Sequence, residues 1–270
     1  MNNKKYKLIN KTFFHSLNRE LYQVEALRDF GYVETGDIGG WVEGEKNLSQ
    51  SGDCWVRDTA QVFGDAKVAE DAQVFGDAQV FDQAQVYGRA RVFEHAQVSG
   101  DAEVCDNAEV YGDACVFGDA KVCDNAEVYG DAIVHENASV KNNATVRGHA
   151  DVCGDATVKD DATVSGHAEV LGDAVIAQDS LIRGNSRVTK NSEVLTAGPL
   201  GEVQRYVECT PDKNTRKMQI SCGCFLGGIE EFAQAISEAS ETDNTDFLLL
   251  LPLLRKKEQE WVEEGNYLPL

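Results

Sequence analysis

A six-residue repeat of aliphatic side chains runs without interruption through the middle of the chain. Every sixth position from Val56 to Val194 holds Val or Ile, twenty-four positions in all, and no insertion breaks the spacing. Four residues after each of the first twenty-three comes a small residue, Ala at twenty positions and Ser at the last three. An Ala-x-Val triplet alternates inward and outward as a short strand does, and the Gly-Asp or Asp-Asn pairs that follow tolerate the backbone angles of a tight corner. Each hexad is therefore predicted to form one strand and one corner.

Near-copies eighteen residues apart set the size of one turn. The segment AEVCDNAEVYGDA at 102–114 returns as AKVCDNAEVYGDA at 120–132. Three hexads therefore make one coil, and the chain is predicted to wind as a triangular prism of about eight parallel β-coils, stacked about 4.8 Å apart. Ala and Val fill so narrow a prism, so we expect no cavity inside it and place any ligand on a face, on an edge or between chains.

The repeat resembles the hexapeptide-repeat proteins, whose fold is a left-handed parallel β-helix and which include trimeric acyltransferases. The left hand is implied by this resemblance alone, and the resemblance also implies a trimer. The flanks look like those of phage and prophage members of this superfamily, some of which are labelled transferases. The segments that carry this narrower resemblance are YQVEALRDFG at 22–31, GDIGGWVE at 36–43, NLSQSGDCWV at 47–56, AGPLG at 197–201 and CGCFLGGIEEF at 222–232.

The predicted fold is dominated by β-structure and has three regions. Residues 1–54 read as an N-terminal β cap with the first irregular coils, 55–197 as the β-helix, and 198–270 as a small C-terminal ββαα unit. Caps are expected because the ends of a β-helix expose unpaired backbone. The elements expected in the two caps are strands at 6–9 and 21–27, a hairpin from 205–210 and 218–222, a helix with Ile229, Phe232, Ala233 and Ile236 on one face, and a second helix over about 246–264.

Charge and composition exclude several classes of function. Acidic residues outnumber basic ones 46 to 25, a net charge of -21, which argues against binding nucleic acid because such binding depends on Lys and Arg. No apolar run is long enough for a signal peptide or a membrane span, so we expect a protein of the bacterial cytoplasm. The eight cysteines follow the repeat or occur singly, and we expect them to be reduced thiols. A lone CxC at 222–224 has no second pair, so no metal or cofactor is expected.

Outward residues can be sorted into three columns by taking the position after each inward Val at a spacing of eighteen. Aromatic side chains crowd the N-terminal half of two columns. Such a stack can simply stabilise the ladder through contacts on one face, but a continuous apolar strip more often marks an interface. We therefore expect a homotrimer. The residues expected near its subunit contacts are Phe63, Phe75, Phe81, Phe93, Tyr111, Phe117 and Tyr129.

A second candidate site lies along the corner that follows the first face. Residues 57–140 hold seventeen acidic and five basic side chains, whereas 141–194 hold eight and six. Exposed ion pairs with no ligand would explain such a cluster. The alternative is a site for a small anion or a nucleotide in the groove between subunits. Its candidate residues are Arg147, His149, Asp151, His167, Glu169, Arg183 and Arg187.

Two functions remain open from the sequence. The preferred hypothesis is a non-enzymatic phage or prophage accessory protein, a rigid trimeric shaft that binds a host protein or sequesters a small charged ligand and so counters host defence. The alternative, implied by the resemblance, is an acyltransferase with His149 or His167 as general base beside Asp151 or Glu169. The repeat runs without the protruding loop that covers the acyl donor in such enzymes, which weakens the alternative.

Overall fold

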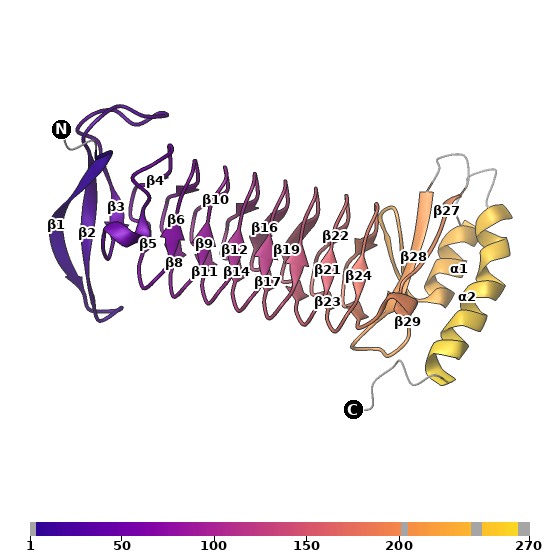
Figure 1. Cartoon of the computed structure of the whole chain (residues 1–270). Coiled ribbons are helices and arrows are strands. Elements are labelled where there is room, and N and C mark those ends of the chain that lie inside the picture. The colour runs from indigo at the N-terminus through magenta and orange to yellow at the C-terminus, as the bar shows by residue number, and fades with distance from the viewer. Residues whose placement is uncertain (1–3, 201–204, 239–244, 264–270) are drawn as a thin grey trace.

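The protein is an elongated β-solenoid with a different cap at each end. The computed structural model describes residues 4–200, 205–238 and 245–263. Its coils stack in chain order from an N-terminal β-sheet to a C-terminal unit that carries two helices (Figure 1). The predicted parallel coils, N-terminal strands and C-terminal sheet with two helices are all confirmed.

Three sheets of parallel strands form the faces of the solenoid, and each strand pairs with the strands eighteen residues before and after it. The first face contains β4 (Trp55–Val56), β7 (Gln73–Val74), β10 (Arg91–Val92), β13 (Glu109–Val110), β16 (Glu127–Gly130), β19 (Thr145–Gly148), β22 (Thr163–Val164) and β25 (Leu181–Ile182). The second face contains β5 (Gln61–Val62), β8 (Gln79–Val80), β11 (Gln97–Val98), β14 (Cys115–Val116), β17 (Ile133–Val134), β20 (Asp151–Val152), β23 (Glu169–Val170) and β26 (Arg187–Val188). The third face contains β6 (Lys67–Val68), β9 (Gln85–Val86), β12 (Glu103–Val104), β15 (Lys121–Val122), β18 (Ser139–Val140), β21 (Thr157–Val158) and β24 (Val175–Ile176).

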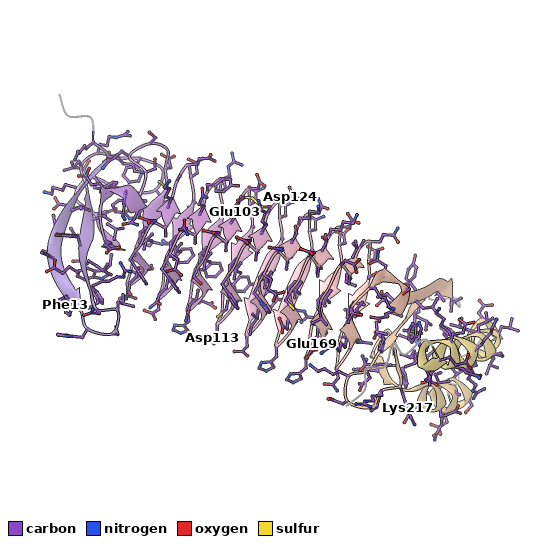
Figure 2. All side chains as sticks on the ribbon, turned by 60° about the horizontal axis from the view of Figure 1, so that its bottom comes forward. Phe13, Glu103, Asp113, Asp124, Glu169 and Lys217 are labelled. Carbon is purple, nitrogen blue, oxygen red and sulfur yellow. A yellow bond between two sulfur atoms is a disulfide. The ribbon has the colours of Figure 1, made fainter. Side chains whose placement is uncertain are left out.

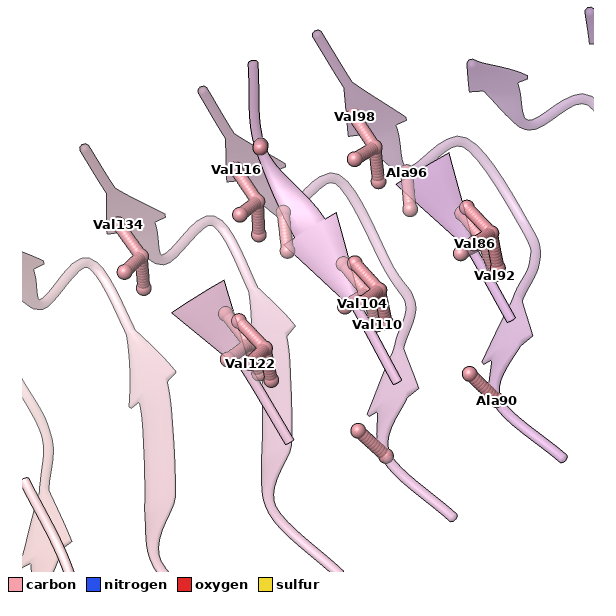
Figure 3. Packing of buried hydrophobic residues seen from close by; sticks show 14 of the residues in the cluster. Val86, Ala90, Val92, Ala96, Val98, Val104, Val110, Val116, Val122 and Val134 are labelled. Atoms are coloured by element: carbon pink, nitrogen blue, oxygen red, sulfur yellow. The ribbon is translucent and has the colours of Figure 1, made fainter. Parts of the chain in front are cut away.

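The interior of the solenoid is one continuous column of aliphatic side chains. The repeat positions from Val56 to Val188 are at most 1 % exposed, as are the Ala positions of the repeat, and they join in a single core. Figure 3 shows Val98, Val116 and Val134 stacked from one coil to the next. Fully burying a Val side chain contributes about 1.5 kcal/mol or more. Hydrophobic burial along the axis thus supplies the main driving force for winding.

The corners explain the acidic residues that stand two positions after a repeat Val or Ile. From Asp58 to Gly184 the residue two positions after each repeat Val or Ile has a positive φ, for example 57° at Asp58 and 69° at Gly76, so Gly suits it and Asp, Asn, Glu or Gln tolerates it. Where the corner residue is acidic, its carboxylate accepts a hydrogen bond from the corner N–H of the next coil. These bonds include Gly76 to Asp58 (3.1 Å), Gly88 to Glu70 (3.0 Å), Gly112 to Glu94 (2.9 Å) and Gly154 to Glu136 (2.8 Å).

The N-terminal cap is an antiparallel extension of the second face. Strands β1 (Tyr6–Phe14), β2 (Arg19–Ala26) and β3 (Ile38–Val42) pair in that order, and β3 then pairs in parallel with β5. A short 3-10 helix, η1 (Glu45–Asn47), precedes the first regular coil. The hydroxyl of Tyr6 donates to the backbone oxygen of Leu48 at 2.6 Å and fixes the cap on that coil.

The C-terminal unit covers the other end with a sheet and two helices. A 3-10 helix, η2 (Asn191–Glu193), leads into β27 (Leu195–Leu200), β28 (Arg205–Pro211), β29 (Met218–Cys222) and β30 (Phe225–Gly227), which form one antiparallel sheet. The predicted hairpin is β28 and β29, and the sheet is wider than expected because β27 and β30 flank it. Helices α1 (Ile229–Glu238) and α2 (Thr245–Glu263) follow, with Pro252 inside α2. Trp261 is fully buried and its Nε1 donates to the backbone oxygen of Ser192.

Candidate functional site

The two histidines predicted as general bases form a stacked pair on an exposed corner. The rings of His149 and His167 lie 4.8 Å apart and nearly parallel, one coil from each other. Nδ1 of His149 is 3.2 Å from an Oδ2 atom of Asp131, which occupies the same corner one coil earlier. The sequence predicts Asp151 or Glu169 as the partner of His149 instead. Asp131 was missed although it shares the eighteen-residue spacing, the signal that could have identified it.

Arg183 holds the C-terminal unit on the last coil. Its Nε donates to Oγ of Ser221 and its Nη2 donates to the backbone oxygen of Gly223, both at 2.7 Å. The carboxylate of Glu208 accepts a hydrogen bond from the backbone N–H of Leu181 close by, at 2.6 Å. The guanidinium of Arg183 is therefore engaged inside the chain.

Glu169 lies at the centre of a small ion-pair network near the C-terminal unit (Figure 2). One carboxylate oxygen accepts from Arg187 at 2.5 Å and the other from Lys213 at 2.6 Å. Lys213, which lies between β28 and β29, also donates to the backbone oxygen of His167 at 2.7 Å. Lys213 could not be predicted from the sequence, because nothing in the repeat indicates which residue of the C-terminal unit folds back on it.

The seven predicted residues do not converge on one point within the chain. Arg147 is exposed on the first face, next to Tyr129 in the strand register. The two histidines lie at the corner, whereas Asp151, Glu169 and Arg187 begin strands of the second face. Arg183 faces the C-terminal unit. The cluster is thus divided into separate polar contacts.

Asp151 belongs to a different group, with His135 and Cys153 on the second face. Nε2 of His135 lies 3.0 Å from Oδ1 of Asp151, and one ligand atom from each of the three side chains lies within 4.8 Å of the others. The His135 ring stacks on Phe117 at 5.0 Å and is 22 % exposed. Burial and the neighbouring Asp151 carboxylate raise the pKa of the Cys153 thiol to about 11. This group is not among the sites predicted from the sequence, although the eighteen-residue spacing of His135 and Cys153 indicates that they lie close together.

The aromatic side chains of the first face form an ordered stack within the chain. The centroids of Phe75, Phe93, Tyr111 and Tyr129 follow one another at 4.8, 4.8 and 4.7 Å, with almost parallel rings. The Arg57 guanidinium lies 4.2 Å from the Phe75 centroid and closes the N-terminal end of the stack. We call these four rings the aromatic column. All four remain partly exposed, so the column presents an apolar strip to the outside.

The second face carries a stack of only two aromatic rings, one of which is buried. Phe63 and Phe81 stack at 5.1 Å, and Phe63 is only 7 % exposed beneath the Arg19 side chain. Phe117 is more open, at 38 %. Among the residues predicted at a subunit contact, Phe63 therefore has the least surface to offer.

The cysteines correct one prediction. Cys105 and Cys123, one coil apart on the third face, are joined by a disulfide bond. The expectation of eight reduced thiols is wrong for this pair, because the parallel register brings their Cα atoms to 4.7 Å, within the range that a disulfide bridges. Six others are free thiols, including both members of the CxC at Cys222 and Cys224.

Comparison with known proteins supports the solenoid. A family model described as the YdcK beta solenoid repeat matches residues 84–100. No curated protein matches the chain. In the ranges described above, neither helix is long and apolar enough to span a bilayer. The chain is a β-solenoid repeat protein whose repeat is similar to that of the YdcK model.

Proposed function

We propose that the protein is a non-enzymatic scaffold of the kind that phages and prophages carry, a homotrimer of rigid shafts that binds a protein partner. The observation that carries the proposal is the aromatic column. Four stacked rings on one face form a continuous apolar strip, and such strips mark interaction surfaces. Packing the strip against the second face of a neighbouring subunit would remove it from water and set three shafts side by side.

The charged groups favour a protein partner over a small anion. Arg183, Arg187 and Lys213, three cations at the last coils and the C-terminal unit, already bind acceptors within the chain. A small anion would have to displace those acceptors. The outward side of α2, by contrast, exposes large apolar side chains at the far end of the shaft. These are Leu248, Leu249, Leu253 and Val262, each at least half exposed.

The trimer is tested by the molar mass in solution. Light scattering should give three times the 29.5 kDa of one chain. Replacing Phe93 and Tyr111 together by Asp should give single chains with an unchanged circular dichroism spectrum. Tyr87→Asp on the third face is the matched control and should remain trimeric. A monomeric wild type, or a double variant that stays trimeric, would overturn the proposed assembly.

The partner is tested on the same protein by crosslinking in host extract. A partner that binds α2 should be crosslinked to the wild type and lost from a Leu249→Ser, Leu253→Ser variant that keeps its trimeric mass. A ligand at a hundred times its Kd stabilises a protein by about 2.7 kcal/mol, so thermal unfolding with a panel of nucleotides detects the rival small-ligand function. Stabilisation by a nucleotide, with no crosslinked partner, would replace the protein-binding proposal.

One observation favours a second candidate function, acyl transfer. His149 and Asp131 form a histidine–carboxylate pair, and such a pair can orient an imidazole as a general base. The pair is more than half exposed, so a base there would need a second subunit to exclude water. Stabilisation by coenzyme A thioesters, with turnover that His149→Ala abolishes, would establish this function instead.

A further inference from the structure

Three side chains of metal-binding type meet on the second face of the solenoid. His135 follows β17, Asp151 begins β20, and Cys153 follows β20. The parallel register pairs Ile133 with Asp151, so His135 and Cys153 project from the same side of the sheet one coil apart. Asp151 stands two residues before Cys153 on the same coil and already contacts His135 at 3.0 Å. Two successive coils thus bring an imidazole nitrogen, a carboxylate oxygen and a sulfur within 4.8 Å of one another.

The surroundings hold these donors in place and favour a cation. The Phe117 ring, one coil earlier, stacks on the imidazole at 5.0 Å with 16° between the planes and restricts its rotation. The Glu136 carboxylate adds negative charge near Cys153. The Glu169 carboxylate and the Arg187 guanidinium, which also lie near Cys153, form an ion pair and offset each other's charge.

We propose that His135, Asp151 and Cys153 bind a zinc ion, or another divalent transition metal that prefers the same ligand types. Imidazole nitrogen, carboxylate oxygen and thiolate sulfur are the three ligand types of protein zinc sites, whereas calcium and magnesium select oxygen alone. Tetrahedral zinc holds such atoms about 3.3–3.8 Å apart, so the ligands need only a small rotation to close around it. On binding, the Cys153 thiol releases its proton to solvent and its sulfur bonds to the metal.

Within one chain the site has three protein ligands and is partly exposed, which leaves the fourth position for water, a ligand or a group of the subunit that the proposed trimer packs against this face. This arrangement is that of reactive zinc sites, whereas structural zinc sites use four protein ligands. A second group of potential metal ligands lies on the third face and differs from this site. Cys105, Asp106 and Cys123 also lie close together, but the two sulfurs there are bonded to each other.

Cobalt substitution of the full-length protein tests the proposal. After chelator treatment under argon, the protein should take up one cobalt ion per chain in the second-face site and show the near-ultraviolet charge-transfer band of a thiolate–cobalt bond. Zinc should displace the cobalt and abolish the band. Cys153→Ser should remove the band, and His135→Gln should weaken zinc binding at least tenfold in competition with a chromophoric chelator.

Two cysteine variants serve as matched controls. Cys115→Ser removes a partly exposed thiol from the same face, and Cys224→Ser disrupts the CxC. Both should keep the band and the zinc affinity. A band that survives Cys153→Ser, a band lost only in Cys224→Ser, or the absence of a thiolate–cobalt band in the wild type would overturn the proposal.

Discussion

The corner carboxylates allow a direct test of whether their hydrogen bonds to the next coil stabilise the solenoid. Glu94 has a φ of 59°, and its Oε2 accepts a hydrogen bond from the N–H of Gly112 at 2.9 Å. Ala at this position keeps the left-handed backbone but removes the acceptor. Gly removes the acceptor and relieves the backbone strain. The two substitutions therefore separate the hydrogen bond from the strain.

The expected sizes follow from these two effects. A hydrogen bond of this kind contributes about 1 kcal/mol, so Glu94→Ala should lower the free energy of unfolding by about that amount. Glu94→Gly loses the same bond and about 0.7 kcal/mol through the freer unfolded chain, but recovers about 1–2 kcal/mol of strain. Its free energy of unfolding should stay within about 0.7 kcal/mol of the wild type.

Urea unfolding followed by circular dichroism measures these differences. Asp113→Ala is the control, because it removes a carboxylate from the corner that contains Gly112 without changing a left-handed residue. It reports the effect of lower net charge alone. Equal losses in the Glu94→Ala and Glu94→Gly variants, or a loss in Asp113→Ala as large as that in Glu94→Ala, would refute the reasoning.

Two further predictions concern the core and the C-terminal unit. Val116→Ala removes two methyl groups from a fully buried position and should lower the free energy of unfolding by about 2 kcal/mol. Ile133 on the same sheet is 37 % exposed, so Ile133→Ala should lower the free energy of unfolding by less than about 1 kcal/mol in the same urea assay. Burial raises the pKa of Glu208, so its carboxyl group holds a proton more tightly in the folded state than in the unfolded state. Its contribution to stability is therefore complete below the pKa of the unfolded state and declines as the pH rises through the pKa of the folded state. Glu208→Gln should therefore flatten the fall in unfolding temperature as the pH is raised from about 4.5 to 7, and an unchanged slope would contradict this account.

The fold could be predicted because the repeat leaves the backbone few choices. Val74, Val92 and Val110 share one face only if eighteen residues make a coil, and burying them requires the parallel register that the structure has. The C-terminal unit was harder, since β27 follows directly from the repeat and carries no strong alternation of its own. The hydrophobic face of α1 was readable because its apolar residues recur at helical spacing.

The candidate site could be predicted only in part, because contacts between outward side chains depend on rotamers and on distant segments. The column spacing places His149 beside His167, and the structure confirms that contact. It does not tell whether Asp151 turns toward His149 or toward His135, sixteen residues earlier, and the structure shows the latter. Nor does it reveal that Arg183 is bound by the C-terminal unit, whose docking depends on its own core. The eighteen-residue spacing of Cys105 and Cys123 indicates that they lie one coil apart, but it does not show that they are bonded.

The eighteen-residue register makes the length of the shaft adjustable in whole steps. A deletion of 103–120 would join Ala102 to Lys121, keep each remaining Val in phase, and leave both end units unchanged. A duplication of the same segment would do the reverse. Each such event would shift the N-terminal sheet relative to the C-terminal helices by about 4.8 Å. The distance between the two end units therefore changes in fixed increments, set by the number of eighteen-residue coils between them.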